Sequence, residues 1–162
     1  TGTFRYPATT ARTYEVAADL LRMGADCGVL SSAVYERYPY RRIELLKELL
    51  GNLRMTVDDQ VASWCLDLKT KEELSIKPED SENLSDLIRG IDSVQVAVFF
   101  EELKDCSVRV SMRSKDVNLA NVSKICSHFG GGGHPLASGA RVNGELHEVE
   151  ERVLDEICNT IT

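Results

Sequence analysis

The stretch SVQVAVFFEELKDCSVRVSMRS, residues 93–114, contains two runs rich in β-branched and aromatic residues. Such runs favour β-strands, and Lys104 and Asp105 separate them with a turn. The sequence therefore predicts an antiparallel strand pair. Because side chains alternate along a strand, Arg109, Ser111 and Arg113 are expected on one face of the second strand, with apolar residues on the other.

Further strands are predicted on both sides of this pair. Residues 53–57 and 61–66, separated by Asp58 and Asp59, indicate a second strand pair, and residues 137–142 indicate a short strand near the C-terminus. Together these segments predict a small mixed sheet from about residue 52 to the end of the chain.

Helices are predicted before the sheet and between its strands. Thr10 is expected to cap a first helix, which ends near Gly24, and a second helix continues towards Pro39. The third, residues 40–51, is apolar on most sides, so we expect it to pack between two bodies. Later helices are expected at residues 84–91, at 119–129 with Asn118 as the cap, and at 145–161. The fold class is α+β, with an all-helical N-terminal part that is typical of the end of another domain.

Composition limits the class of protein. The chain has 162 residues, of which 43% are hydrophobic and 28% charged, as in globular proteins. No apolar stretch approaches the roughly 20 residues of a membrane span. Five single cysteines without a CxxC pair favour free, buried thiols in a reducing cytoplasm. The net charge of −7 argues against binding to long duplex nucleic acid, but leaves room for a small anion in a local basic pocket.

The motif FGGGGHPLASGA, residues 129–140, is the strongest candidate for a binding site. Each ordered glycine costs roughly 0.5–1 kcal/mol more backbone entropy than alanine. Successive amides without Cβ atoms can converge on a phosphate, to which a histidine can also donate. A helix cap followed by a turn is the alternative. The predicted binding residues of this motif are Gly130, Gly131, Gly132, Gly133 and His134.

A second group of candidates follows the predicted strand end. Arg113, Ser114 and Lys115 stand together, and Arg113 is suited to planar, bidentate phosphate recognition. The alternative is an ordinary half-exposed strand whose polar residues face water.

Catalytic groups are not evident. His128, His134 and His147 lack the neighbouring acidic ligands of a two-metal site. Ser138 lies near His134 in the sequence, but this proximity alone does not indicate a Ser–His–Asp catalytic arrangement. We therefore predict neither catalytic residues nor metal ligands in this chain.

Three motifs resemble those of the DHH phosphoesterases. TGTFRY at residues 1–6, SMRSK at 111–115 and FGGGGHPLASGA at 129–140 are similar to the branch of oligoribonucleases (nanoRNases) and pAp phosphatases, related more distantly to RecJ exonuclease. The resemblance spans the chain in the expected order. It implies a two-domain hydrolase, in which an N-terminal DHH domain of α/β type binds two manganese ions and a DHH-associated domain binds the substrate.

The resemblance also implies a division of this chain. Residues 1–35 would be the C-terminal remnant of the DHH domain, 36–51 a connecting helix, and 52–162 the DHH-associated domain. The family's metal-binding motifs precede TGTFRY, so the chain alone is expected to be inactive, with its manganese ligands elsewhere. Implied partners are short RNA oligonucleotides or 3′-phosphoadenosine 5′-phosphate (pAp) and the missing DHH domain, without a membrane.

Two alternatives stay open from the sequence. Related C-terminal domains occur in alanyl-tRNA synthetase, so the chain could be a non-catalytic nucleic-acid- or nucleotide-binding module. The parent enzyme could also act on cyclic dinucleotides or polyphosphate.

Overall fold

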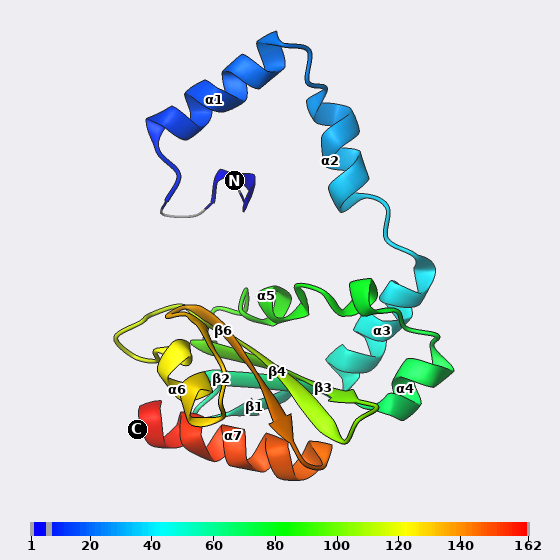
Figure 1. Cartoon of the computed structure of the whole chain (residues 1–162), viewed down its shortest axis with the longest axis vertical. Helices are drawn as coiled ribbons and strands as arrows, with labels where there is room; N and C mark the ends of the chain where they lie inside the picture. The colour runs from blue at the N-terminus through cyan, green and yellow to red at the C-terminus, as the bar shows by residue number, and fades with distance from the viewer. Residues whose placement is uncertain (1, 6–7, 162) are drawn as a thin grey trace. The chain divides into compact units, whose positions relative to one another are not determined.

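The computed structural model describes residues 2–5 and 8–161, and the chain divides into two compact units, Thr1–Tyr38 and Pro39–Thr162 (Figure 1). The first unit contains η1 (Gly2–Phe4), α1 (Ala11–Arg22) and α2 (Cys27–Tyr35). Thr10 is the N-cap of α1, as predicted, and Asp26 caps α2 by accepting a hydrogen bond from the Val29 amide at 3.0 Å. Neither α1 nor α2 has a buried residue, so this unit has no core of its own.

The second unit is built on a mixed sheet. Among the described residues, six strands pair in the order β1 (Arg54–Thr56), β2 (Val61–Leu66), β3 (Val96–Leu103), β4 (Ser107–Ser114), β6 (Ala137–Asn143) and β5 (Gly132–His134). The β2–β3 pair is parallel and the others are antiparallel. The two predicted antiparallel pairs, β1–β2 and β3–β4, are confirmed, as is the α+β class.

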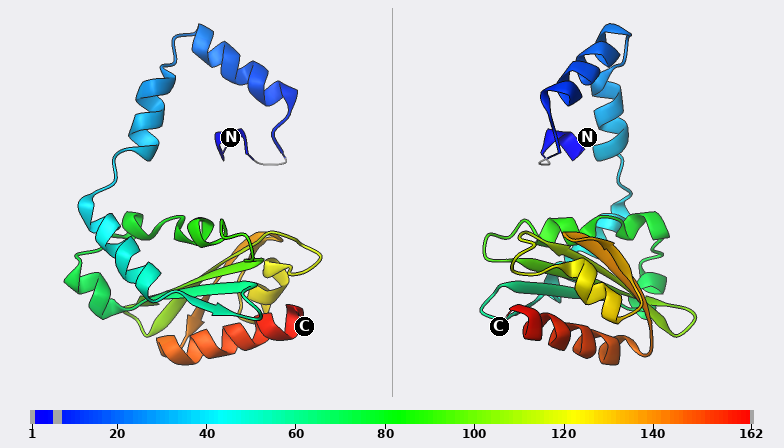
Figure 2. Two further views of the ribbon diagram at one scale, coloured as in Figure 1. Left: turned by 180° about the vertical axis from the view of Figure 1, so that it is seen from behind. Right: turned by 60° about the vertical axis from the view of Figure 1, so that its left-hand side comes forward.

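Helices cover one sheet face fully and the other only in part (Figures 1 and 2). On the first face, α6 (Val122–His128) and α7 (Leu146–Ile161) pack against alternate residues of β3, β4 and β6. On the second face, α3 (Tyr40–Gly51) and α5 (Leu84–Ile88) bury residues of β2 and β3, among them Trp64 and Phe99. The apolar core on this face stops at β3, because the residues of β4 that follow on the same face are Arg109, Ser111 and Arg113.

Two predicted element boundaries were wrong. The cap of α6 is Asn121, whose Oδ1 accepts from the amides of Ser123 (3.1 Å) and Lys124 (3.2 Å). Asn118 instead donates its amide to Asp116 in the preceding turn. The helix predicted to reach residue 91 ends at Ile88, shortly before Gly90.

The glycine run and one short helix also differ from the prediction. Gly132, Gly133 and His134, for which no strand was predicted, form β5 because they pair with β6. Helix α4 (Leu68–Glu73) was not predicted, since its six residues carry little apolar periodicity. It is followed by a 3₁₀ turn, η2 (Pro78–Ser81).

A buried carboxylate joins α3 to η2. The Asp80 side chain is 1% exposed and accepts from Arg41 Nε at 2.5 Å and from the Lys77 amide at 2.8 Å. Burial alone would raise the pKa of Asp80, but the hydrogen bonds from Arg41 and Lys77 and the charges of Arg41 and Arg42 together lower it below its ordinary value of 3.8. Ionised Asp80 therefore stabilises the fold above that pH, and the contribution is lost as the pH falls through the lowered pKa.

We expect Asp80→Asn to reduce the free energy of unfolding by about 1–3 kcal/mol at pH 7, because the replacement weakens charge-assisted hydrogen bonds. The deficit should shrink below pH 3.8 as wild-type Asp80 becomes protonated. Urea unfolding between pH 7 and pH 3 measures this, with Glu79→Gln, an exposed neighbour, as the control. An equal deficit at every pH would mean that the Asp80 charge does not contribute.

Candidate functional site

Strand pairing brings the two predicted motifs onto one face of the sheet. Arg113 of β4 is opposite Ala137 of β6, which is opposite His134 of β5. In the next row on the same face, Ser111 is opposite Gly139, which is opposite Gly132. Directly paired residues project from the same side of a sheet. We call the surface formed by these six residues the open face.

The middle of the open face has almost no side chains. Between Arg113 and His134 lies only the methyl group of Ala137, and the neighbouring row contains Ser111 and two glycines. Gly132 is exposed, and a Cβ atom added there would meet nothing within 4 Å. A ligand can therefore lie directly on the backbone of β5 and β6, with a cationic group on one side and an imidazole on the other.

The glycines of the run have different structural roles. Gly130, at φ +74°, follows α6, and the amides of Gly130 and Gly131 donate to Ser127 O (3.1 Å) and Cys126 O (2.8 Å), which is a Schellman cap. A Cβ at Gly131 would lie 2.2 Å from Gly139 O and 2.6 Å from Ala140 Cβ. Gly133 is also closely packed, with a Cβ position 2.8 Å from Ala137 O. The cap and the pairing of β5 with β6 account for three glycines, and they do not require a glycine at Gly132.

His134 is oriented by its own loop. Its Nδ1 accepts from the Leu136 amide at 3.2 Å, so the neutral ring carries its proton on Nε2. The loop is tied to the start of α6, because Ser123 Oγ donates to Gly133 O at 2.9 Å and the Val122 amide donates to Pro135 O at 3.0 Å. The exposed imidazole can thus donate to an anion without first taking up a proton.

Arg113 keeps part of its guanidinium available. Its Nη1 donates to Met112 O at 3.0 Å, and its Nε lies 3.6 Å from Asp86 Oδ1. Asp86 is shared with Arg89, whose Nη2 is 3.1 Å away, so two cations face one carboxylate. An excess positive charge therefore remains at this end of the open face.

The other two residues predicted beside Arg113 are engaged elsewhere. Ser114 is fully buried, and its Oγ donates to Asp116 O at 3.0 Å. Lys115 Nζ donates to Ile91 O at 2.6 Å and to Asp92 O at 3.1 Å. A role for these side chains in binding stays a prediction, and it would require these hydrogen bonds to break.

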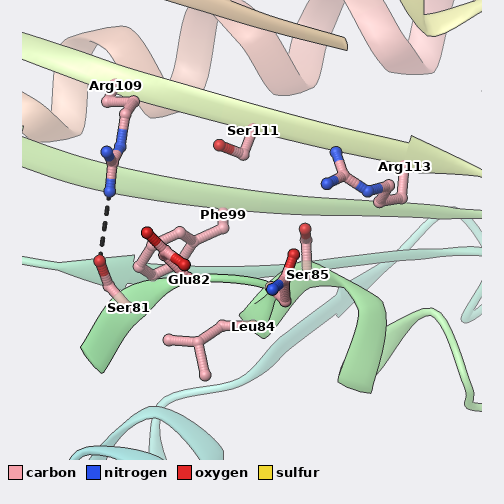
Figure 3. Close-up of a pocket in the computed structure, with 9 residues that line it drawn as sticks. Ser81, Glu82, Leu84, Ser85, Phe99, Arg109, Ser111 and Arg113 are labelled. Carbon is pink, nitrogen blue, oxygen red and sulfur yellow. Dashed lines mark hydrogen bonds between the residues drawn. The ribbon is translucent and has the colours of Figure 1, made fainter. Parts of the chain in front are cut away.

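Tertiary structure adds a pocket beside the open face (Figure 3). It lies between the η2–α5 segment and strands β3 and β4. Its lining residues are Ser81, Glu82, Asn83, Leu84, Ser85, Phe99, Arg109, Ser111 and Arg113. Sequence reasoning missed residues 81–85, because nothing in their spacing distinguishes them from the exposed end of an ordinary short helix.

Arg109 is held at the far end of this pocket. Its Nη2 donates to Glu101 Oε2 and, at 3.2 Å, to Ser81 Oγ. The side chain of Glu101 is 4% exposed and also accepts from Lys71 Nζ at 2.8 Å. Arg109 is therefore fixed by direct hydrogen bonds to Glu101 and Ser81, whereas Arg113 Nε lies 3.6 Å from its carboxylate partner, Asp86.

The cysteines do not provide a nucleophile in the core. All five are free, as predicted, but the expected burial holds only for Cys126, and Cys27 and Cys106 are exposed. Burial, together with neighbouring Glu150, which is paired with Arg54 at 3.2 Å, raises the pKa of Cys65 to about 12. Burial also raises the pKa of Cys126 to about 11. Both thiols are protonated at neutral pH, so neither is an activated nucleophile.

Metal ligands do not gather in the part of the chain that the structure describes. Among residues 2–5 and 8–161, no group of three His, Cys, Asp or Glu side chains is placed to hold a metal ion. The same residues include no helix long and apolar enough to cross a membrane.

Known proteins resemble this chain at the level of sequence and fold. Residues 60–162 match the DHHA1 domain. The probable bifunctional oligoribonuclease and PAP phosphatase NrnA of Streptococcus mutans is 34% identical over 161 residues, which cover 99% of this chain and 50% of that protein. The bifunctional oligoribonuclease and PAP phosphatase NrnA of Thermus thermophilus is 32% identical and covers 100% of this chain and 48% of its own length.

A solved structure matches the fold over almost the whole chain. The exopolyphosphatase-related protein from Bacteroides fragilis superposes with a TM-score of 0.88 at 25% identity, covering 98% of this chain and 46% of that one. The chain thus spans about half the length of the curated relatives it matches.

Proposed function

This chain belongs to the DHHA1 domain family, and on that premise we propose that it is the substrate-binding part of a phosphoesterase that hydrolyses short oligoribonucleotides or pAp. The resemblance to the oligoribonuclease and pAp phosphatase branch is confirmed at the level of homology. The observation that carries the proposal is the open face, where Arg113, Gly132 and His134 come together from two motifs.

The open face has the chemistry to hold a terminal phosphate. Arg113 and His134 stand in one row on either side of Ala137, and the charge-assisted hydrogen bonds that a guanidinium or an N–H group donates to phosphate are stronger than bonds between neutral groups. Strand β5 is the edge of the sheet, so its outer backbone groups have no strand partner. The small residues of the open face, Ala137, Gly139 and Gly132, permit a ligand to approach the backbone of β5 and β6 closely. The acidic net charge fits a ligand with few phosphates, which needs one local site rather than a basic surface.

In this proposal, hydrolysis belongs to a longer protein. Residues 1–35 are assigned to the end of a DHH catalytic domain, 36–51 to a connecting helix and 52–162 to the DHHA1 domain. Manganese ions would be held by the catalytic domain, outside the residues described here. The coreless helices α1 and α2 support an assignment of the first residues to a larger domain. Within this chain, the residues bind and orient the substrate.

We expect the 162-residue chain to bind pAp and the dinucleotide pApA with a 1:1 stoichiometry, and to release no phosphate from them in the presence of Mn²⁺. Calorimetry at several salt concentrations measures binding, and mass spectrometry detects products. The affinity should fall with a logarithmic salt slope of only about 1–2, as for a ligand with two phosphates. Tripolyphosphate and a duplex of 20 base pairs are the comparison ligands. Tighter binding of the duplex, or no binding of pAp and pApA, would contradict the proposal.

A further inference from the structure

The pocket beside the open face is apolar at its base. Phe99, which is 3% exposed, lies in the gap between the η2–α5 segment and β4, and Leu84, which is 2% exposed, also lines the pocket, with its side chain directed away from β4 (Figure 3). Arg109 and Arg113 mark its two ends, with Ser111 between them. A flat group that enters this pocket can contact carbon atoms on one side and a planar guanidinium at either end.

Polar groups with unused hydrogen-bonding capacity line the same pocket. The Ser85 hydroxyl points towards β4 (Figure 3) and makes no hydrogen bond within the described residues. It is not one of the fully buried polar atoms that lack a partner, so it is open to the pocket. The Glu82 side chain is exposed at the rim and forms no ion pair within the described part of the chain, although its backbone carbonyl accepts from Arg42 Nη2 at 3.0 Å. The pocket thus presents a hydroxyl and a carboxylate to a ligand.

The distribution of charge separates this pocket from the phosphate site. Glu82 would repel a phosphate group, and the Arg109 guanidinium is hydrogen-bonded to the buried Glu101 and to Ser81. Arg113 has a looser contact with its carboxylate, 3.6 Å from Asp86 Oδ1, so its guanidinium is the more available one for an anion where the pocket meets the open face. A ligand that fits both places has its anion beside Arg113 and a neutral, planar, polar group between Phe99 and Glu82. A nucleotide has this arrangement of groups.

We propose that this pocket binds a nucleobase, and that Glu82 selects bases with an exocyclic amino group. A carboxylate only accepts hydrogen bonds, so it favours the amino groups of adenine, cytosine and guanine over the carbonyl that uracil carries at the corresponding position. The Ser85 hydroxyl can donate or accept a hydrogen bond, so it can pair with a ring nitrogen both of the bases that have an exocyclic amino group and of uracil. This inference rests on the proposed function, because it assumes that the phosphate is held beside Arg113.

The test compares the affinities of pApA and pUpU for the chain by calorimetry. The wild-type chain should bind pApA about tenfold more tightly than pUpU, as expected for a charge-assisted hydrogen bond. Glu82→Ala should bring this ratio close to one, mainly by weakening pApA. Ser85→Ala should weaken both ligands. Glu79→Ala is the matched control, because it removes an exposed carboxylate of the same 3₁₀ turn that does not line the pocket.

The outcomes distinguish this inference from the proposed function. A ratio near one in the wild-type chain, or the same fall in the ratio for Glu79→Ala, would overturn the base pocket while nucleotide binding at the open face stands. Failure to bind either dinucleotide would overturn both. Urea unfolding of each variant shows whether its fold is retained, and the exposed position of Glu82 makes that variant the more informative one.

Discussion

Arg113→Ala is expected to weaken the binding of pAp and pApA by about ten- to a hundredfold. The guanidinium would donate a charge-assisted hydrogen bond worth about 1.5–3 kcal/mol, and roughly 1.4 kcal/mol corresponds to a factor of ten in affinity. Arg113→Lys should recover little of the loss, because an ammonium group cannot form the bidentate contact. Calorimetry on the 162-residue chain measures both variants.

Arg141→Ala provides a matched control for Arg113. Arg141 lies on the same sheet face but paired with Arg109, four residues along β4 from Arg113, and its guanidinium is already bound to Asp105. Arg141→Ala removes one positive charge, as Arg113→Ala does, but it should alter the affinity for pAp and pApA less than Arg113→Ala does. If Arg113→Ala left the affinity unchanged, Arg113 would be only a structural partner of Asp86.

Gly131→Ala is expected to produce the largest loss of stability among variants of the glycine run. The new Cβ would lie 2.2 Å from Gly139 O and 2.6 Å from Ala140 Cβ, and neither β6 atom belongs to a flexible side chain. The backbones of β5 and β6 would have to separate, which costs about 1–3 kcal/mol or more in a packed region. The midpoint of urea unfolding should fall by about 1 M.

Gly132→Ala is the neighbouring variant that tests binding instead. A Cβ there meets nothing within 4 Å, so the urea midpoint should stay close to that of the wild-type chain. The added methyl group would stand on the open face, where it should reduce the affinity for pAp by steric contact. Unchanged affinity in Gly132→Ala would show that the glycines serve the fold alone and that the phosphate is held elsewhere.

The local pattern of the sequence was sufficient to predict the central strands, β3 and β4, and the half of the candidate site that lies on β4. Residues 96–100 form a continuous apolar run and residues 107–114 alternate, so β3, β4 and the common face of Arg109, Ser111 and Arg113 could be predicted without knowing any tertiary contact. The glycine–histidine motif could likewise be recognised as a candidate site. Its four glycines could not be told apart, because their roles depend on which atoms of β6 lie beside each one.

Tertiary structure decided which residues meet. Strand β5 has no side-chain pattern or β-propensity, so only its pairing with β6 makes it a strand and places His134 in line with Arg113. Residues 81–85 line a pocket because α3 and Asp80 hold η2 near the sheet, a contact between residues 39 positions apart. Short-range periodicity reports which face of an element is apolar, but it contains no information on which distant element covers that face. For this reason the open end of the sheet, beyond β3 where the apolar core beneath α3 and α5 ends, was visible only in the folded chain.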